Sequence, residues 1–274
     1  MGKETKIDWC DATWNPVTGC LHGCDYCFAR KQAHRFTGYP AEGKNHELTS
    51  RVFVSKRCDS GSQGTEHVCA YPYDFDPTLH RYRLDIPAKW KDPRTIFVCS
   101  MADLFGGWVP DGWIWEVFAA CEKAPWHRYI FLTKNPGRYD QILDNYMPPN
   151  MWFGWSQEGP LGSKTVFTSH HSVNTFVSIE PLHRPFNEFH IRGIGWAIVG
   201  AETGNRKGKI IPEKKWVDDI AAACREAGVP LFMKESLRHI MGDDFRQEFP
   251  WDKPDQTLAW GDANAAAYAD NPTV

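Results

Sequence analysis

Six short apolar runs, rich in β-branched and aromatic residues, follow one another between residues 94 and 233. Runs of this length and composition are typical of buried strands. We therefore predict strands at residues 95–99, 129–132, 151–153, 175–177, 196–199 and 231–233. A series of buried strands restricts the fold more than any other feature of the chain, because each strand needs a neighbour and a covering layer.

Helical patterns fill several of the intervals between these runs. The first helix has Asp111 as its predicted cap and an apolar face of Trp113, Ile114, Val117, Phe118 and Cys121. The second begins near Pro136 and buries Tyr139, Ile142, Leu143 and Tyr146. The third carries Trp216, Ile220 and Cys224 on one stripe and stops at Gly228. Alternating strands and helices predict an α/β fold with a parallel sheet and crossover helices.

The rest of the chain is less regular. Residues 12–16 lead to the top of a predicted first strand, and a first helix begins at Phe28. Residues 37–93, rich in Gly, Pro, Asp and Tyr, indicate a loop-rich insertion. The tail 253–274 is rich in Ala, Asp and Asn. We expect one domain over residues 1–252 that contains the insertion, followed by the tail.

Three cysteines, Cys20, Cys24 and Cys27, stand in a Cys-x-x-x-Cys-x-x-Cys pattern within a turn-rich segment. Three thiolates in one short loop match three irons of a cubane cluster, and the fourth iron stays open to a substrate or cofactor. Zinc sites and electron-transfer clusters normally take four protein ligands. The alternative is three buried cysteines that act as small hydrophobic residues, but Gly19 and Gly23 indicate a loop.

Composition indicates the cellular compartment of the protein and therefore the state of its cysteines. The chain has 274 residues, 42% of them hydrophobic, and no apolar stretch that predicts a signal peptide or a membrane span. We expect a cytoplasmic protein, in which clustered cysteines bind metal or react rather than form disulfides. Cys99, Cys121 and Cys224 have apolar neighbours and are predicted core residues. Cys10, Cys58 and Cys69 have polar neighbours, and their spacing matches no metal motif.

Polar groups follow the predicted strands. Ser100 and Asp103 come after the first, Lys134 after the second, Glu180 after the fourth and Glu202 after the fifth. Lys234 follows the last. Because the carboxyl ends of parallel strands converge in α/β barrels, these groups are predicted to share one site. Opposite charges at one site suit a zwitterion such as an amino acid head group. The alternative is that strand ends become polar where they meet water.

Taken together, these motifs resemble known proteins. The cysteine loop, with Tyr26 before its last cysteine, resembles the cluster loop of radical S-adenosylmethionine (SAM) enzymes. Five blocks between residues 13 and 204 are similar to a phage-associated family of uncharacterised radical-SAM-like proteins: TWNPVTGC, FVCSMADLF, FLTKNPGRY, VSIEPL and IVGAETG.

The resemblance implies a partial (β/α)6 TIM-like barrel and a [4Fe-4S] cluster on Cys20, Cys24 and Cys27. SAM would bind the open iron and be cleaved reductively, and the radical formed would take hydrogen from a substrate. Tyr26 matches the aromatic position near the adenine. Many relatives have a Gly-Gly-Glu motif after the second strand, where this chain has Ser100 to Asp103; we expect those two residues to receive the methionine amino group. Lys134, Glu180 and Glu202 complete the expected cofactor site.

The implied partners are a reductase or flavodoxin-type electron donor and a substrate of unknown class. A phage association makes a nucleic acid or nucleotide a candidate, with Arg30, Lys31, Arg35, Lys134 and Arg138 as phosphate contacts, although a solvated surface explains them equally well. Two other functions stay open: a binding module in which the triplet and His22 or Cys10 hold zinc, and a barrel whose cluster only transfers electrons.

Overall fold

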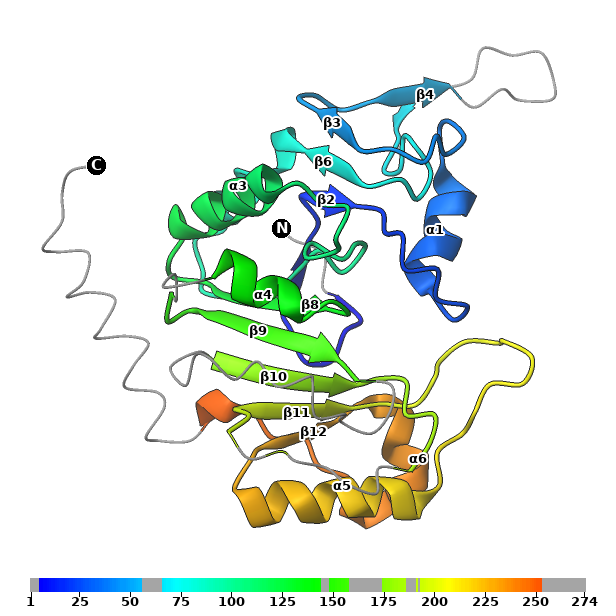
Figure 1. Ribbon diagram of the computed structural model, residues 1–274, viewed down its shortest axis with the longest axis vertical. Helices are drawn as coiled ribbons and strands as arrows, with labels where there is room; N and C mark the ends of the chain where they lie inside the picture. The colour runs from blue at the N-terminus through cyan, green and yellow to red at the C-terminus, as the bar shows by residue number, and fades with distance from the viewer. Residues whose placement is uncertain are drawn as a thin grey trace, which may run out of the picture.

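A curled, seven-stranded parallel sheet forms the centre of the molecule (Figure 1). The computed structural model describes residues 5–55, 66–143, 148–157, 174–185, 191 and 193–252. The strand order is β1-β7-β8-β9-β10-β11-β12, and every neighbouring pair is parallel. The strands are Ala12–Trp14, Thr95–Val98, Arg128–Thr133, Met151–Ser156, Asn174–Ile179, Trp196–Val199 and Leu231–Met233. This partial TIM-like barrel confirms the predicted fold class.

The strand predictions are confirmed, with differences at the ends. β8, β9 and β10 each extend beyond their apolar run, because the backbone ladder continues into polar residues such as Thr133 and Ser156. β7 ends one residue early. Cys99 takes a left-handed backbone conformation (φ 57°), and its N–H donates to the carbonyl of Trp14. The chain therefore turns away from the sheet at Cys99.

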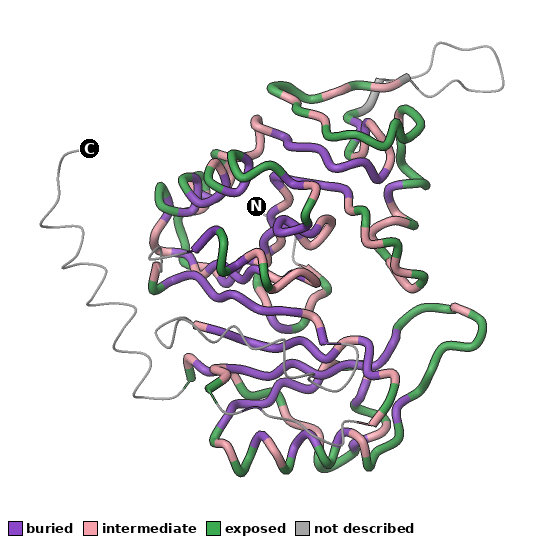
Figure 2. Tube along the Cα trace, in the orientation of Figure 1, coloured by how far each residue is buried: buried purple, intermediate pink, exposed green. Residues whose placement is uncertain are grey.

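The strands of this sheet are buried along most of their length (Figure 2). From β7 to β12, alternate residues belong to two different apolar layers, so both sides of the sheet are buried. The concave side carries Ile130, Trp152, Phe176, Trp196, Ile198 and Phe232. Trp9 packs against these residues from the N-terminal segment, and Phe249 and Trp251 pack against them from the last described residues. The interior of the half-barrel is thus filled by side chains from both ends of the described chain.

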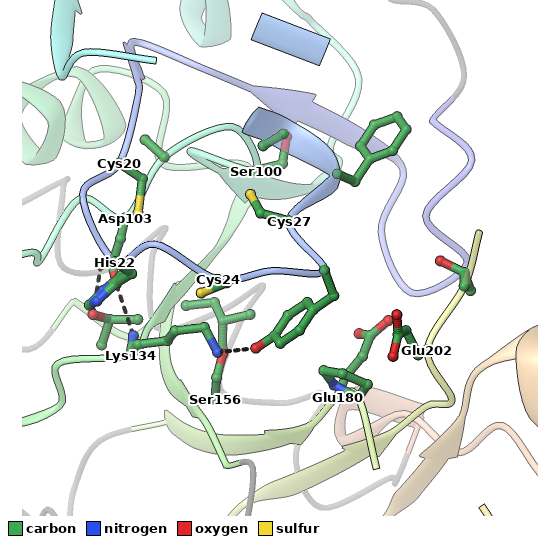
Figure 3. A pocket seen from close by; sticks show the side chains of 18 of the residues that line it. Cys20, His22, Cys24, Cys27, Ser100, Asp103, Lys134, Ser156, Glu180 and Glu202 are labelled. Atoms are coloured by element: carbon green, nitrogen blue, oxygen red, sulfur yellow. Dashed lines mark hydrogen bonds and ion pairs between the residues drawn. The ribbon is translucent and has the colours of Figure 1, made fainter. Parts of the chain in front are cut away.

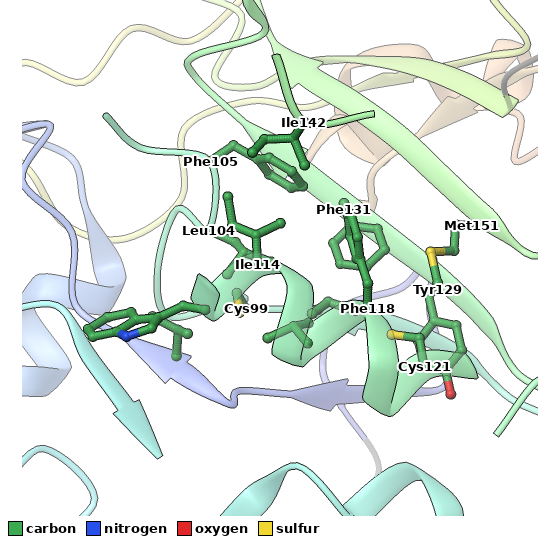
Figure 4. Close-up of a cluster of buried hydrophobic side chains, with 14 of the residues drawn as sticks. Cys99, Leu104, Phe105, Ile114, Phe118, Cys121, Tyr129, Phe131, Ile142 and Met151 are labelled. Carbon is green, nitrogen blue, oxygen red and sulfur yellow. The ribbon is translucent and has the colours of Figure 1, made fainter. Parts of the chain in front are cut away.

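Helices cover the convex side. α3 (Asp111–Glu122) and α4 (Gly137–Ile142) pack on β7, β8 and β9, where Phe105, Phe118 and Phe131 form an aromatic cluster (Figure 4). α5 (Lys214–Ala227) packs on β10, β11 and β12 and ends at Gly228, whose φ of 70° suits glycine. The predicted apolar faces of α3 and α5 are confirmed; Tyr146 lies outside the described residues.

One predicted cap is wrong. Asp111 is the first residue of α3, Pro110 occupies the cap position, and no side chain caps the helix there. The Asp111 carboxylate pairs instead with Arg138 of α4. The guanidinium also donates to the carbonyl of Val109, so Arg138 connects α4 to the start of α3. A capping motif read from sequence cannot detect this competing partner, because the partner is distant in the chain.

The insertion region contains more regular structure than its composition indicates. β2 (Val17–Thr18), β6 (Thr78–His80) and β3 (His46–Leu48) form a small sheet, and β4 (Phe53–Ser55) pairs with β5 (Glu66–Val68). The insertion also contains one short helix, α2 (Ile86–Lys89). The predicted first helix, α1 (Phe28–Phe36), comes directly before the insertion. Because β2 immediately precedes the cysteine loop, the insertion is attached to that loop through β6.

The remaining elements are short. α6 (Arg238–Met241) and 3-10 turns at Arg81–Arg83, Glu235–Leu237, Gly242–Asp244 and Pro250–Asp252 connect or end the larger ones. In the described ranges no helix has both the length and the apolar character needed to cross a bilayer. The predicted tail, 253–274, lies outside the described residues, so the division into domain and tail stays a prediction.

Candidate functional site

The cysteine loop connects β2 to α1 and is fixed at both ends. Gly19 has a φ of 89°, and a Cβ on it would lie 2.1 Å from the carbonyl oxygen of Asp76, so only glycine fits. The N–H of Cys20 donates to the carbonyl of Phe75 over 3.1 Å. At the other end, the Cys27 sulfur accepts from the N–H of Arg30 and caps α1. The three cysteines thus lie on a short arc between two anchors.

A cavity of about 300 Å³ opens beside this loop at the carboxyl ends of the strands (Figure 3). Its floor includes Phe97 and Leu132, which also pack on the concave apolar layer. All nine residues predicted for the metal and cofactor sites line it: Cys20, Cys24, Cys27, Tyr26, Ser100, Asp103, Lys134, Glu180 and Glu202. The structure therefore brings together side chains that are spread over more than 180 positions of the sequence.

Asp103 connects the cysteine loop to the ends of β7 and β8. Its side chain is buried, and its two oxygens accept hydrogen bonds from four donors. The Thr133 hydroxyl (2.7 Å) and the N–H of Phe105 (3.1 Å) donate to Oδ1. The N–H of Lys134 (2.9 Å) donates to Oδ2, which also contacts Nε2 of His22 at 2.7 Å. Since His22 lies between Cys20 and Cys24, Asp103 holds the middle of the loop.

Two further contacts position the cavity wall. The Lys134 ammonium donates to the Tyr26 hydroxyl over 2.8 Å and lies 5.4 Å from the ring centroid. Tyr26 is therefore held at its polar end by the residue that follows β8. The Ser100 hydroxyl and the N–H of Met101 both donate to Oδ1 of Asn15, at 3.2 and 2.9 Å. Asn15 thereby fixes the turn after β7 from the end of β1.

The acidic residues of the later strands are paired. Glu180 forms an ion pair with Lys234. Glu202, whose side chain is 3% exposed, accepts both Nε (2.6 Å) and a terminal nitrogen (2.7 Å) of Arg206 and contacts His183 at 3.2 Å. The hydrogen bonds from Arg206 lower the pKa of Glu202 to about 2. The opposite charges expected at a zwitterion site are present, but here they contact each other.

A second hollow of about 470 Å³ lies on the outer side of the loop. It shares His22, Cys24, Tyr26 and Lys134 with the first cavity and adds His183 and Arg206 from the turns after β10 and β11. Its lining is mainly polar. The tip of the cysteine loop therefore borders both a more apolar cavity and a mainly polar one.

The donor set fits a [4Fe-4S] cluster with three protein ligands. Cys20, Cys24 and Cys27 are half-buried, form no disulfides and line one cavity. A cubane takes each thiolate on a separate iron, whereas a single zinc ion needs its ligands to meet at one point. Across the described ranges, no three His, Cys, Asp or Glu side chains gather as ligands of a single ion. Burial raises the pKa of the Cys20 thiol to about 12, so metal binding there must release a proton.

Two of the three cysteines that were predicted to lie in polar surroundings are buried or pack against apolar residues instead. Cys69 is buried, and its thiol contacts the carbonyl oxygen of Phe36. Cys10 packs against the concave apolar layer, and burial raises the pKa of its thiol to about 12. Cys58 lies outside the described residues. The three predicted core cysteines, Cys99, Cys121 and Cys224, are confirmed as buried.

Four residues that hold the predicted ones in place were not predicted from the sequence: Asn15, Thr133, His183 and Arg206. Asn15 lies in a motif, but its role depends on a partner 85 positions away. Arg138 is the opposite case, since it was predicted as a phosphate contact and is instead 14% exposed and paired with Asp111.

Fold and site define a half-barrel α/β protein with a three-cysteine loop at the carboxyl edge of its sheet. The chain belongs to the family described as "Protein of unknown function (DUF5131)", whose sequence model matches residues 4–248. No curated protein sequence matches it.

Among solved structures, the chain is similar to a "Spore photoproduct lyase complexed with dinucleoside spore photoproduct", with 11% identity, a TM-score of 0.47 and coverage of 85% of this chain and 79% of that one. It is also similar to a double mutant of spore photoproduct lyase with bound AdoMet and dinucleoside spore photoproduct, with 10% identity, a TM-score of 0.48 and coverage of 84% and 78%. Similarity at this level does not carry function from one chain to another.

Proposed function

We propose that this protein is a radical SAM enzyme, with a [4Fe-4S] cluster held by Cys20, Cys24 and Cys27 and SAM bound in the adjoining cavity. The observation that carries the proposal is the cavity itself. Three thiols of one loop line it together with six polar or aromatic residues that the sequence predicts as cofactor contacts. A phage association and a cytoplasmic location stay predictions from the sequence.

When bound, the cluster and SAM supply one-electron cleavage of SAM to methionine and a 5′-deoxyadenosyl radical, which removes a hydrogen atom from the substrate. Because the reaction consumes an electron, a flavodoxin-type donor or a reductase belongs to the proposal.

The chain's own residues hold and shield these groups. Asp103 fixes the cysteine loop through His22, and Lys134 orients the Tyr26 ring toward the cavity. The Ser100 hydroxyl lies at the cavity wall, where it can take part in holding the amino group of SAM. Phe97 and Leu132 close the floor and exclude water from below. Glu180 and Glu202 present carboxylates to the same cavity from the far strands.

The test is anaerobic purification and reconstitution of the full chain, followed by analysis of iron, sulfide and zinc. We expect about four irons and four sulfides per chain in the wild type. Reduction with dithionite in the presence of SAM is expected to release 5′-deoxyadenosine, measured by chromatography. Cys20→Ala, Cys24→Ala and Cys27→Ala are each expected to abolish that product and to lower the iron content.

Cys10→Ala is the matched control, because Cys10 is half-buried but does not line the cavity. It is expected to keep the iron content and the product of the wild type. Stoichiometric zinc without sulfide would instead establish a zinc-binding module. A reducible cluster that never yields 5′-deoxyadenosine would establish a protein that only transfers electrons.

A further inference from the structure

Two exposed segments border the cavity on opposite sides. The helix lip, residues 28–36, is α1, and its first residues Phe28 and Ala29 line the cavity. The loop lip, residues 203–211, follows β11, and Thr203 lines the cavity from that side. In Figure 1 the tip of the cysteine loop lies between the two lips. A ligand that contacts both lips therefore lies across the opening.

Both lips are basic. The helix lip contains Arg30, Lys31 and Arg35, and the loop lip contains Arg206, Lys207 and Lys209. Neither segment contains an aspartate or a glutamate. The chain as a whole has a formal net charge of −3, so positive charge is concentrated where the cavity opens. Such a local concentration attracts a polyanion even when the whole protein is acidic.

Not all six cations contribute equally. Arg206 is paired with the buried Glu202, and the guanidinium of Arg30 lies over the Phe75 ring at 5.6 Å. Lys31, Arg35, Lys207 and Lys209 are exposed. The Lys209 ammonium donates to the carbonyl of Gly204, a bond that a stronger acceptor would displace. Two cations on each lip are thus open to a ligand from solvent.

Apolar side chains are exposed among these charges. Phe28 is 68% exposed and Phe36 is 50% exposed on the helix lip, and Ile211 is 63% exposed on the loop lip. The guanidinium of Arg35 lies 5.3 Å from the centroid of the Phe36 ring, and the half-exposed ring still presents a surface to solvent. Aromatic rings between basic residues are the usual surface for stacked bases of a single strand.

We propose that the two lips bind a single strand of nucleic acid across the cavity opening, with phosphates on Lys31, Arg35, Lys207 and Lys209 and a base on Phe28 or Phe36. The inference rests on the proposed function in one respect, because it gives the hydrogen-abstraction site a polynucleotide substrate. A nucleotide must leave its stack to reach a recessed site, and a single strand meets that need at the lowest cost. The polar hollow beside Tyr26 and His183 offers space for it.

A small acidic electron carrier is the competing ligand for a basic surface. Protein interfaces are depleted of charge at their centre and need a continuous contact area. Here the cations lie on two lips with an opening between them, which suits an extended polyanion better.

The experiment measures binding of a fluorescein-labelled single-stranded DNA of about 20 nucleotides to the full chain by anisotropy, at roughly 50 to 200 mM salt. Lys31→Ala/Arg35→Ala and Lys207→Ala/Lys209→Ala are each expected to weaken binding about tenfold at low salt. Each is also expected to make the slope of log association constant against log salt concentration shallower by about 1.4. For a single strand, each phosphate contact contributes about 0.7 to this slope, and each variant removes two contacts.

Lys91→Ala/Lys123→Ala is the matched control. Both lysines are exposed, and they lie before β7 and β8, at the opposite end of the sheet from the cavity. This variant is expected to bind as the wild type does. Phe28→Ala/Phe36→Ala is expected to weaken binding at least about fivefold without changing the salt slope, because stacking releases no counterions.

The inference is overturned if the wild type does not bind the strand, or if the lip variants and the control bind alike. Binding of an acidic flavoprotein through the same lysines, without DNA binding, overturns it as well. The assay needs neither cluster nor SAM, and Cys20→Ala is expected to bind DNA normally. Loss of cluster chemistry and loss of DNA binding therefore report separately on the two proposals.

Discussion

At the scale of single residues, Asp103 shows how one buried carboxylate organises the candidate site. Its four donors come from three segments: the cysteine loop, the turn after β7 and the end of β8. A carboxylate that already accepts four hydrogen bonds acts first as a support for the loop. Its predicted contact with SAM stays a prediction.

We expect Asp103→Ala to lower the free energy of unfolding by about 3 kcal/mol, because buried donors such as the N–H of Phe105 lose their acceptor. Urea unfolding of the protein without cofactor measures this loss. Asp103→Asn keeps the shape and one acceptor oxygen, so its loss should be smaller. Equal stability of the alanine variant and the wild type would contradict the assigned role.

The position of Asp103 was predicted from sequence, whereas its partners were not. A polar residue just after a buried strand is a local signal that can be read directly. The pairing with His22 spans 81 positions, and only the closure of the sheet brings the two together. Glu202 differs in that its partner, Arg206, is only four positions away in the chain. Its place in the cavity nevertheless depends on the position of β11 in the sheet.

At the scale of elements, the small sheet β2-β6-β3 anchors the start of the cysteine loop. His80 of β6 is buried, and its ring Nε2 lies 2.9 Å from the Thr18 hydroxyl of β2. The backbone N–H of His80 donates to the carbonyl of Pro16. Burial lowers the pKa of His80 to about 3. The insertion is thus a structural support of the loop, which its irregular composition did not predict.

This burial makes stability depend on pH. In the unfolded chain His80 has a pKa of about 6.5, so the unfolded state binds a proton below that pH. In the folded state the imidazole stays neutral until the pH falls to about 3. Stability from neutral His80 is therefore complete above about pH 6.5 and falls as pH decreases, by about 1.4 kcal/mol per pH unit. Unfolding free energies at roughly pH 7.5 and 5.5 measure it. His80→Gln should show a shallower fall, and an unchanged pH dependence would refute the assignment.

At the scale of the whole molecule, the concave side of the sheet is filled by both ends of the described chain. Trp9 packs on Phe97 (centroids 4.7 Å apart) and on Trp196 (6.2 Å), and Phe97 in turn lines the cavity. The N-terminal segment therefore supports the cavity floor. A parallel sheet that does not close into a barrel needs such a filling, because its concave face is apolar.

Trp9→Ala is expected to reduce the free energy of unfolding by about 3–5 kcal/mol, since it leaves a large void in this layer. Trp115→Ala is the control: Trp115 is 43% exposed on α3, and the expected loss is below about 1 kcal/mol. Denaturant unfolding of both variants makes the comparison. Similar losses in the two would show that Trp9 is not part of the core.

The order of the main strands and helices, the cysteine loop and the polar residues after each strand could be predicted from the sequence, because these are short-range patterns of burial and turn chemistry. Three features required the folded chain: the donors that surround Asp103, the ion pair that Arg138 forms with Asp111, and the support that Trp9 gives to the cavity floor. Those contacts depend on the curl of the sheet, which brings distant loops to one edge. Hydrogen bonds and packing act over a few ångströms in space, at any separation along the chain, so short-range sequence patterns do not reveal them.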